Sequence, residues 1–476
     1  MEGQTQHVET PLSSDQYTKA KASEAPEATG ERLPTAERLR RAQSEHDSRL
    51  AANINESVRI VLARRTFEGD PNAEIRQREL DILEGAPIVS RNPVDESGVG
   101  VTERCVVGDG DDERIAFLKW QRGELAVSRG DEGPLKALRT LRDDGTMEVG
   151  FKPILGKRAD MFNRLFSLRD TERPKLKEKM SALYGIPPEK VPLRTDIIGV
   201  KRIDVGHSPK AETAASVFSS ICGFSEIPPA AMRVDRHELG SLQLRVPGKT
   251  LTTDQLADIY EQGAGHPIAP SLARLAAEDY GFIKNIDRHL NNLFVDEENG
   301  QCYGIDHGSS NGYSVPNPDV APDAHRALQS YPADKYRSVA MEVVDDHPKM
   351  MLSQAERTQM RRIVNEVTMY VRFKEDALSK EEAKALPDHV REGHMAKLLS
   401  DTFRMLHERV DEDGNVLPET TAIAKRELHD CIARIDYLAL HGRPPHLSAT
   451  QHDRDSLKLT AKAHIKSRSE KREKAA

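Results

Sequence analysis

The chain contains few cysteines, few aromatic residues and no long hydrophobic run. Its four cysteines lie far apart among 476 residues, and no two of them form a CxxC pair. This spacing excludes a cysteine-based metal knuckle and a dense disulfide framework, and it favours reduced thiols in a cytosolic protein. No stretch approaches the roughly 18 consecutive apolar residues that a membrane-spanning helix needs, so no transmembrane segment is predicted. The first residues also lack the apolar core of a Sec-type signal peptide.

A surplus of positive charge is missing as well. The sequence has 69 Lys and Arg residues against 77 Asp and Glu residues, which gives a formal net charge of -8. Proteins that bind nucleic acid usually present a basic surface, so this balance argues against nucleic acid as a partner. The length allows two or three domains, and a hydrophobic content of 37% allows a sizeable core if some segments stay outside it.

The two ends of the chain differ from its middle in composition. Residues 1–95 are predicted to be a mostly disordered leader, because residues 1–60 contain a single aromatic residue, Tyr17. Within the leader, residues 35–65 have the composition of a fragmentary helix. Such a leader suits either an ordinary flexible terminus or a non-Sec signal that delivers a bacterial effector into a host cell. Residues 451–476 form a basic tail that is either solvated or able to contact an anionic membrane peripherally.

The middle of the sequence predicts an α+β catalytic domain over residues 96–380, followed by a helical extension over residues 381–450. Short strands joined by Asp and Gly turns come first, then a helix, two more strands, and mainly helices from about residue 270. One later helix opens with a capping box from Ser353 to Glu356, and another ends near Gly442. The first part of the pattern is carried by RCVVGDGDDERIAFLKW (104–120), MEVGFKPI (147–154), HSPKAETAASVFSSICGF (207–224), SEIPPAAMRVD (225–235) and LGSLQLRVPG (239–248).

The strongest functional signal is the pair of motifs NIDRHLNN (285–292) and GIDHG (304–308). Phosphoryl transfer requires a carboxylate near the attacking hydroxyl, an amide and a carboxylate on Mg²⁺, and a cation on the ATP phosphates. Asp287 and Asn292 have the spacing Asp-x-x-x-x-Asn, and the intervening LFVD-EENG-QCYG predicts a hairpin that returns Asp306 to Asn292. We therefore expect Asp287 to act on the acceptor hydroxyl, and Asn292 and Asp306 to hold the metal.

A lysine, a glutamate and a linker with the expected order precede these motifs. Lys152 lies on the predicted strand 147–154, and Glu212 lies near the start of the following predicted helix, so the two are assigned as the phosphate-binding cation and its partner. The segment LQLRVP then joins the last of these strands to the helices and is assigned as the hinge that meets the adenine. ATP contacts are expected there from Gln243, Leu244 and Val246.

Together, FKP, KAETAASVFSSICGFSEIPPA, NIDRHLNNLFVD and GIDHG resemble the phosphatidylinositol 3-/4-kinase catalytic superfamily. The similarity is closest to its type II phosphatidylinositol 4-kinase-like branch and covers roughly residues 100–380. The resemblance implies an atypical, bilobal protein-kinase-like fold with a β-rich N-lobe, a helical C-lobe, an ATP·Mg site and an inositol-lipid or protein acceptor. By matching position, Arg288 and His289 would support the catalytic loop and the γ-phosphate. The sequence departs from the pattern in lacking a clear Gly-rich phosphate loop and in having Asn291 where relatives often have a small residue.

Other functions remain open at this point. A pseudokinase could bind nucleotide and act as a scaffold without transferring phosphate, and a nucleotidyltransferase could use the same fold. The GSSNG motif around Ser310 resembles a hydrolase nucleophile elbow, but the prolines that follow exclude the helix that such an elbow requires. Between the two acceptors, the segment 307–332 contains no Trp, Phe or Lys to engage a phosphoinositide membrane, which favours a protein acceptor.

Overall fold

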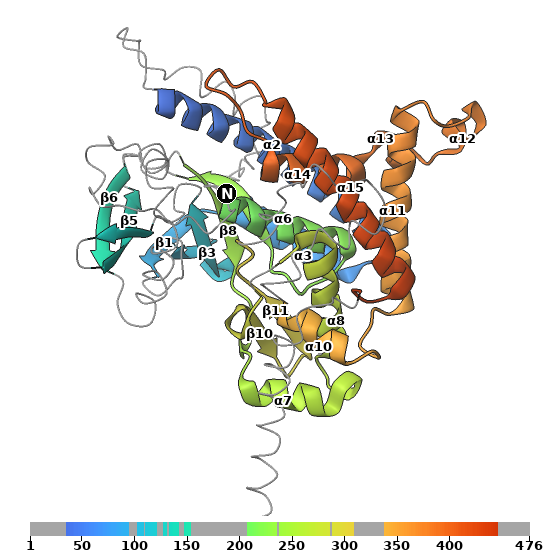
Figure 1. Cartoon of the computed structure of the whole chain (residues 1–476), viewed down its shortest axis with the longest axis horizontal. Coiled ribbons are helices and arrows are strands. Elements are labelled where there is room, and N and C mark those ends of the chain that lie inside the picture. Colours follow the sequence, from blue (N-terminus) through green and yellow to red (C-terminus); the bar gives the residue numbers. More distant parts are fainter. Residues whose placement is uncertain are drawn as a thin grey trace, which may run out of the picture.

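The chain is a mixed α+β structure whose sheets are antiparallel (Figure 1). No helix in the part of the chain that the structure describes is long and apolar enough to cross a membrane. The computed structural model describes residues 35–94, 102–108, 110–120, 127–130, 133–141, 147–153, 207–235, 238–285, 288–308 and 338–445.

The largest sheet has the strand order β1-β2-β3-β8-β7. Helix α6 packs on this sheet and contacts β3, β7 and β8. Small residues along α6, such as Ala211, Ala214 and Ala215, are fully buried, so its backbone can approach the sheet closely. The bounds are β1 (Ile88–Pro93), β2 (Thr102–Val107), β3 (Arg114–Trp120), α6 (His207–Cys222), β7 (Ala230–Asp235) and β8 (Glu238–Leu244).

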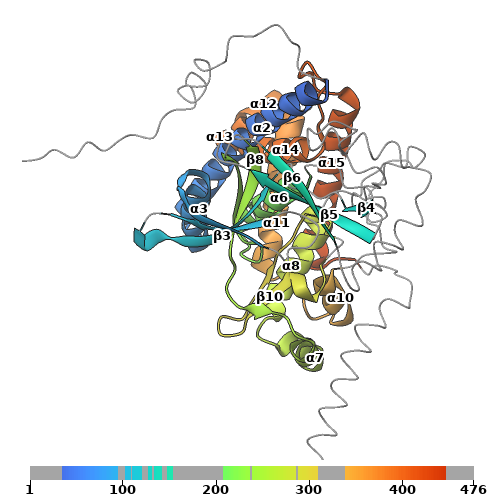
Figure 2. The ribbon, with the colours of Figure 1, turned by 90° about the vertical axis from the view of Figure 1, so that its left-hand side faces the viewer.

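Two smaller sheets accompany it. Strands β10 and β11 form the hairpin predicted from LFVD-EENG-QCYG, which confirms that prediction, and β9 extends it to three strands. The third sheet has the order β4-β5-β6, and its strand β6 confirms the predicted strand around residues 147–154 (Figure 2). The bounds are β4 (Val127–Gly130), β5 (Gly133–Leu141), β6 (Met147–Pro153), β9 (Lys249–Thr250), β10 (Leu293–Asp296) and β11 (Gln301–Gly304).

The amino-terminal part of the described chain forms two helices, α2 (Thr35–Phe67) and α3 (Pro71–Gly85). Helix α2 contacts α6, α14 and β7, and it buries a stripe of apolar residues on one face. Helix α3 begins after Asp70, whose carboxylate accepts a hydrogen bond from the Asn72 backbone, and Pro71 occupies its first turn. The buried stripe of α2 includes Leu50, Ile54, Val58 and Leu62.

The prediction of a mostly disordered leader over residues 1–95 is therefore wrong for residues 35–94. The average composition of the segment is polar, but its apolar residues recur every fourth position and so gather on one helix face. That face belongs to the main hydrophobic cluster of the described chain. Residues 1–34 and the basic tail 451–476 lie outside the described residues.

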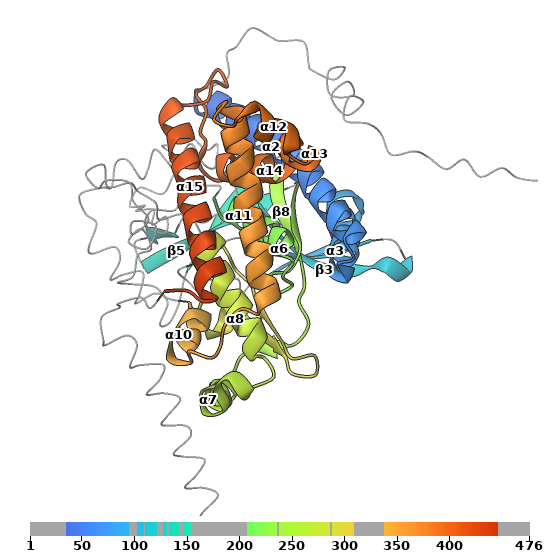
Figure 3. The same ribbon diagram turned by 90° about the vertical axis from the view of Figure 1, so that its right-hand side faces the viewer.

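The rest of the structure is mainly helical. Helices α11 and α15 lie side by side, and α14 contacts α2, α6 and α15 (Figure 3). The predicted capping box from Ser353 to Glu356 is present at the start of α11. Gly442, with a left-handed φ of 74°, caps the end of α15 as predicted. The predicted extension 381–450 is helical over its described part, but α14 shares the core with α2 and α6.

Helices α7 and α8 connect β9 to the segment that precedes β10. Between α8 and β10, a π-helical turn η4 leads into the loop with the NIDRHLNN motif. The bounds are α7 (Thr253–Gln262), α8 (Ala269–Glu278), η4 (Asp279–Ile283), η5 (Leu290–Asn292), α10 (Val339–Asp346), α11 (Gln354–Lys374), α12 (Lys380–Ala385), α13 (Asp388–Glu392), α14 (His394–His407) and α15 (Pro418–His441), with the 3-10 turns η1 (Gly110–Asp112) and η3 (Gly263–Gly265).

Candidate active site

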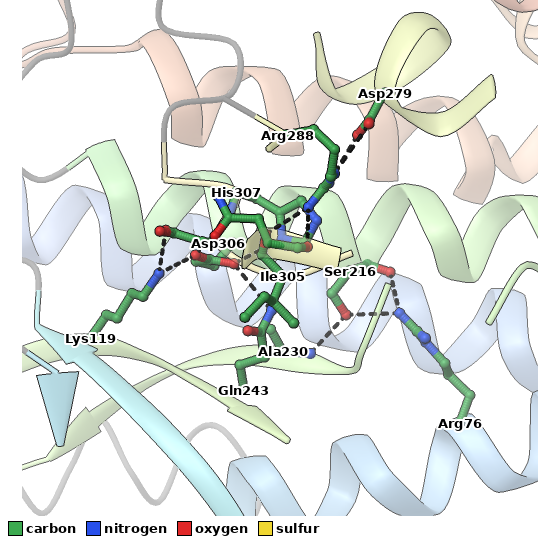
Figure 4. Close-up of polar contacts among 12 residues, drawn as sticks. Arg76, Lys119, Ser216, Ala230, Gln243, Asp279, Arg288, Ile305, Asp306 and His307 are labelled. Atoms are coloured by element: carbon green, nitrogen blue, oxygen red, sulfur yellow. Dashed lines mark hydrogen bonds and ion pairs between the residues drawn. The ribbon is translucent and has the colours of Figure 1, made fainter. Parts of the chain in front are cut away.

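Lys119, near the end of β3, lies between two carboxylates from distant parts of the chain. Its Nζ is 2.9 Å from Asp306 Oδ1, and it also pairs with Glu212 Oε1 from α6 (Figure 4). The Glu212 side chain is fully buried, whereas the Asp306 side chain is 51% exposed. One cation therefore joins β3, α6 and the segment that follows β11.

Lys119 and Glu212 are both charged at neutral pH. Burial alone would raise the pKa of Glu212, but the charge of Lys119 and the contacts with His307 hold this pKa well below its ordinary value. Burial alone would lower the pKa of Lys119, but Asp306 and Glu212 raise it above its ordinary value. Removing Lys119 would leave the buried Glu212 carboxylate without its cation, and an unpaired buried charge destabilises the folded state.

Two further residues, His307 and Gln243, form hydrogen bonds with the Glu212 carboxylate. The His307 backbone N–H donates to Oε1 at 2.9 Å, and His307 Nδ1 lies 2.9 Å from Oε2. Gln243 Nε2 on β8 donates to Oε2 at 3.1 Å. Burial and the charge of Arg288 lower the pKa of His307, so its neutral ring donates from Nδ1 to Glu212. The carboxylate is thereby fixed between the sheet and the chain after β11.

Arg288 and Asp279 form a fully buried ion pair next to the segment that carries Asp306. Arg288 Nη2 lies 2.9 Å from Asp279 Oδ1, and Arg288 Nε donates to Oδ2 at 3.2 Å, a two-point contact. Arg288 Nη1 also donates to the Ile305 carbonyl oxygen at 2.6 Å. A Cβ on Gly304 would come within 2.7 Å of the Arg288 guanidinium, so the glycine allows this close approach. Arg288 thus links its own loop to the residue before Asp306.

Asn292 and Asp306 lie on adjoining backbone segments. The Ile305 N–H donates to the Asn292 carbonyl oxygen at 3.0 Å, which continues the β10–β11 hairpin. Asp306 has a φ of 57°, a left-handed conformation that is uncommon for a residue other than glycine. An amide oxygen and a carboxylate oxygen are ligands that Mg²⁺ accepts when substrate phosphates and water complete its shell. The described residues contain no group of three or more His, Cys, Asp or Glu side chains that could hold a metal alone.

The lysine that pairs with Glu212 in the described residues is Lys119, whereas the sequence assigned Lys152 to this role. Lys152 lies on β6 in the third sheet, opposite Lys136 of β5, whereas the lysine paired with Glu212 is Lys119. The side chain of Lys152 is outside what the structure describes, so its pairing with Glu212 stays a prediction. Sequence reasoning missed Lys119, although it lies on the predicted strand within AFLKW, where Ala116 and Leu118 are buried.

The other predicted residues fall in several places. Asp287 and Ser310 lie outside the described residues, and His289 is exposed next to Arg288. Leu244 and Val246, at the end of β8 and just beyond it, are buried and line a cavity of about 280 Å³. Residues of α2, α3 and the end of α6 line the same cavity, so Leu244 and Val246 face these helices.

Neither a protein-family model nor a curated protein matches this chain. Its function must therefore be inferred from the residues of the site.

Proposed function

We propose that this protein is a kinase with a bilobal kinase-like fold, which transfers the γ-phosphoryl group of Mg·ATP to an alcohol of a protein or a phosphoinositide lipid. The pairing of Lys119 with Glu212 and Asp306 supports the proposal most directly. Protein kinases use a lysine on the third strand, a glutamate on the following helix and the aspartate of an Asp-Phe-Gly triplet in these roles. Lys119 is on the third strand of this chain, and Asp306 begins Asp-His-Gly.

The order of elements gives independent support. Strands β1 to β3 come first, then α6, β7 and β8, then the linker after Leu244, and then the loop and hairpin that carry Asn292 and Asp306. In kinases, the linker after the last N-lobe strand contacts the adenine. The same order was expected from the resemblance to the phosphatidylinositol 3-/4-kinase superfamily, with Lys119 replacing Lys152 in it.

Each residue of the site has a separate role in the proposed phosphoryl transfer. Lys119, held by Glu212, would bind the ATP phosphates, and Asn292 and Asp306 would hold Mg²⁺, which neutralises phosphate charge when bound. The acceptor oxygen forms a bond to the γ-phosphorus as the bond to the ADP oxygen breaks, and Asp287 takes the acceptor proton. Arg288 keeps this loop in place through its buried contacts.

The decisive experiment is incubation of the whole chain with γ-labelled ATP and Mg²⁺, against a phosphoinositide panel and a cell lysate. Wild type is expected to label one class of acceptor, and Asp306→Asn is expected to reduce labelling by about 100-fold or more, because it removes a charge that acts on the transferred group. Full activity in this variant would remove the metal assignment and with it the proposal. Nucleotide-dependent stabilisation without transfer would identify a binding-only protein, and release of pyrophosphate would identify a nucleotidyltransferase.

A further inference from the structure

Helix α6 places Glu212, and the amino-terminal helices hold α6 from its other sides. Lys210 Nζ lies 2.7 Å from Asp47 Oδ2 of α2, and both side chains are at most 2% exposed. Arg65, near the end of α2, donates from Nη1 to the carbonyl oxygens of Ser220 and Ile221 at the end of α6. Both ends of α6 are therefore joined to α2 by buried cations.

Arg76 of α3 makes several hydrogen bonds to α6 and to the chain that follows it. Its Nη2 donates to Ser216 O at 2.9 Å and to Ser216 Oγ at 3.1 Å, and its Nε donates to Ser220 Oγ at 2.9 Å. Its Nη1 donates to Ile227 O, beyond α6, at 2.7 Å. Ser216 Oγ in turn accepts a hydrogen bond from the backbone of Ala230, the first residue of β7 (Figure 4). One guanidinium thus joins α3, α6 and the chain leading into β7.

The positions of these acceptors relate Arg76 to Glu212. Glu212, Ser216 and Ser220 are spaced four residues apart, so they lie along one side of α6. Fixing the second and third of them limits both the rotation and the sliding of the helix. Burial lowers the pKa of Arg76 to about 10, so the group remains a cation at neutral pH and keeps all of its donors.

We propose that Arg76 is a positioning residue for the proposed phosphoryl transfer: it holds α6 in the orientation that places Glu212 against Lys119. The expected effect on kcat rests on the proposed function, whereas the role of Arg76 in holding α6 does not. In this proposal, α2 and α3 have the role of keeping α6 docked on the sheet.

The kinetic test compares Arg76→Met, Arg76→Lys and Arg233→Met. Arg233 is a matched control, because its Nη1 donates from β7 to the carbonyl oxygens of Leu83 and Ala86 at the end of α3. Arg76→Met is expected to lower kcat by about 10- to 100-fold with little change in the KM of the acceptor, since small displacements of a catalytic group have effects of this size. Arg76→Lys, which keeps the charge, should recover part of the loss, and Arg233→Met should stay within about twofold of wild type. An unchanged kcat in Arg76→Met overturns the proposal.

A second readout follows α6 without requiring catalysis. Cys222 is the last residue of α6 and is 4% exposed, while Cys431 of α15 and Cys302 of β11 are fully buried and serve as internal references. Labelling by iodoacetamide is measured at each cysteine by mass spectrometry. Arg76→Met is expected to label Cys222 at least about tenfold faster with Cys431 unchanged, because local opening exposes only the released helix.

The outcomes separate the inference from the proposed function. If wild type transfers no phosphate, the proposed function fails, and the labelling of Cys222 alone decides whether Arg76 holds α6. Unchanged labelling of Cys222 overturns the inference. Equal acceleration at all the cysteines also overturns it, because it indicates general destabilisation. If Arg76→Met does not fold, Arg76→Lys is subjected to both measurements and the same criteria apply.

Discussion

At the scale of single residues, charge pairing across the chain defines the candidate site. Lys119 lies 93 positions from Glu212 and 187 positions from Asp306 in the sequence, yet contacts both. Glu212 is fully buried and keeps its charge only because Lys119, His307 and Gln243 surround it. Replacing any one of these residues is expected to destabilise the site, because it leaves a buried polar or charged group without a partner.

The two lysines can be distinguished by one substitution each. Lys119→Met is expected to reduce phosphate transfer by about 100-fold or more, since the cation proposed to bind the ATP phosphates is lost. Lys152→Met is the matched control and is expected to stay within about twofold of wild type, because Lys152 lies on a different sheet. Initial rates with γ-labelled ATP provide the measurement. The reverse result would restore Lys152 as the phosphate-binding residue.

Acid should weaken the contact between α2 and α14 through Glu408. Its Oε2 lies 3.1 Å from His46 Nε2, and Arg404 and Thr421 bind its Oε1 at 3.0 Å. Burial alone would raise the pKa of Glu408, but the bonds from His46 and Arg404 lower it to about 2. A lowered pKa means that this stabilisation is complete above the unfolded pKa of about 4.3 and is lost as the pH falls through the folded value.

Urea unfolding at pH 7, pH 5 and pH 3 provides the comparison with Glu408→Gln. The variant should have a lower free energy of unfolding than wild type at pH 7, and the difference should shrink by about pH 3, because the unfolded wild-type chain binds a proton at Glu408 there and the folded chain largely does not. A constant difference over this range would show that ionisation of Glu408 does not contribute.

At the scale of secondary-structure elements, α2 behaves as part of the core. Its apolar face contacts α6 and α14, and its polar side chains add an ion pair from Asp47 to Lys210 and a contact from His46 to Glu408. The helix therefore stabilises the element that carries Glu212 as well as the helices behind it. Composition alone did not indicate this, because charged residues on the outer face of α2 dilute its apolar stripe.

Two isoleucines on α2 test this role. Ile54 is 0% exposed and Ile60 is 37% exposed on the same helix. Ile54→Ala should lower the free energy of unfolding by about 2–5 kcal/mol, because it creates a cavity in the core. Ile60→Ala should cost less than about 1 kcal/mol, since solvent already reaches that side chain. Equal effects in chemical denaturation would mean that α2 is not packed as described.

At the scale of the whole molecule, charge bears on the choice of acceptor. The net charge of -8 repels an anionic bilayer, and the segment 307–332 offers no Lys, Trp or Phe to a membrane. Residues 309–332 lie outside the described residues, so the choice rests on composition. These features favour a protein acceptor over a phosphoinositide.

Vesicle co-sedimentation at about 0.15 M salt tests this preference, because screening there leaves only specific affinity. The full chain is expected to remain in the supernatant with phosphatidylcholine–phosphatidylserine vesicles, and addition of phosphoinositide should not change this. Tight phosphoinositide-dependent binding, combined with conversion of phosphatidylinositol to its monophosphate by wild type but not by Asp287→Ala, would reverse the preference.

The sequence by itself determined the local features of this protein. The capping box at Ser353, the end of α15 at Gly442 and the β10–β11 hairpin all follow from residues within a few positions of one another. The same holds for the motif that brings Asn292 and Asp306 to the open end of the hairpin, because a short hairpin places its two flanking residues side by side.

Only the tertiary structure decided which lysine meets Glu212 and whether α2 belongs to the core. Lys119 and Lys152 both lie on strands that the sequence predicts, and nothing local distinguishes them. The distinction arises because β3 pairs with β8 and lies beneath α6, whereas β6 pairs with β5 in another sheet. Contacts between residues so far apart depend on how elements pack, and packing is set by the whole set of apolar faces rather than by any one segment.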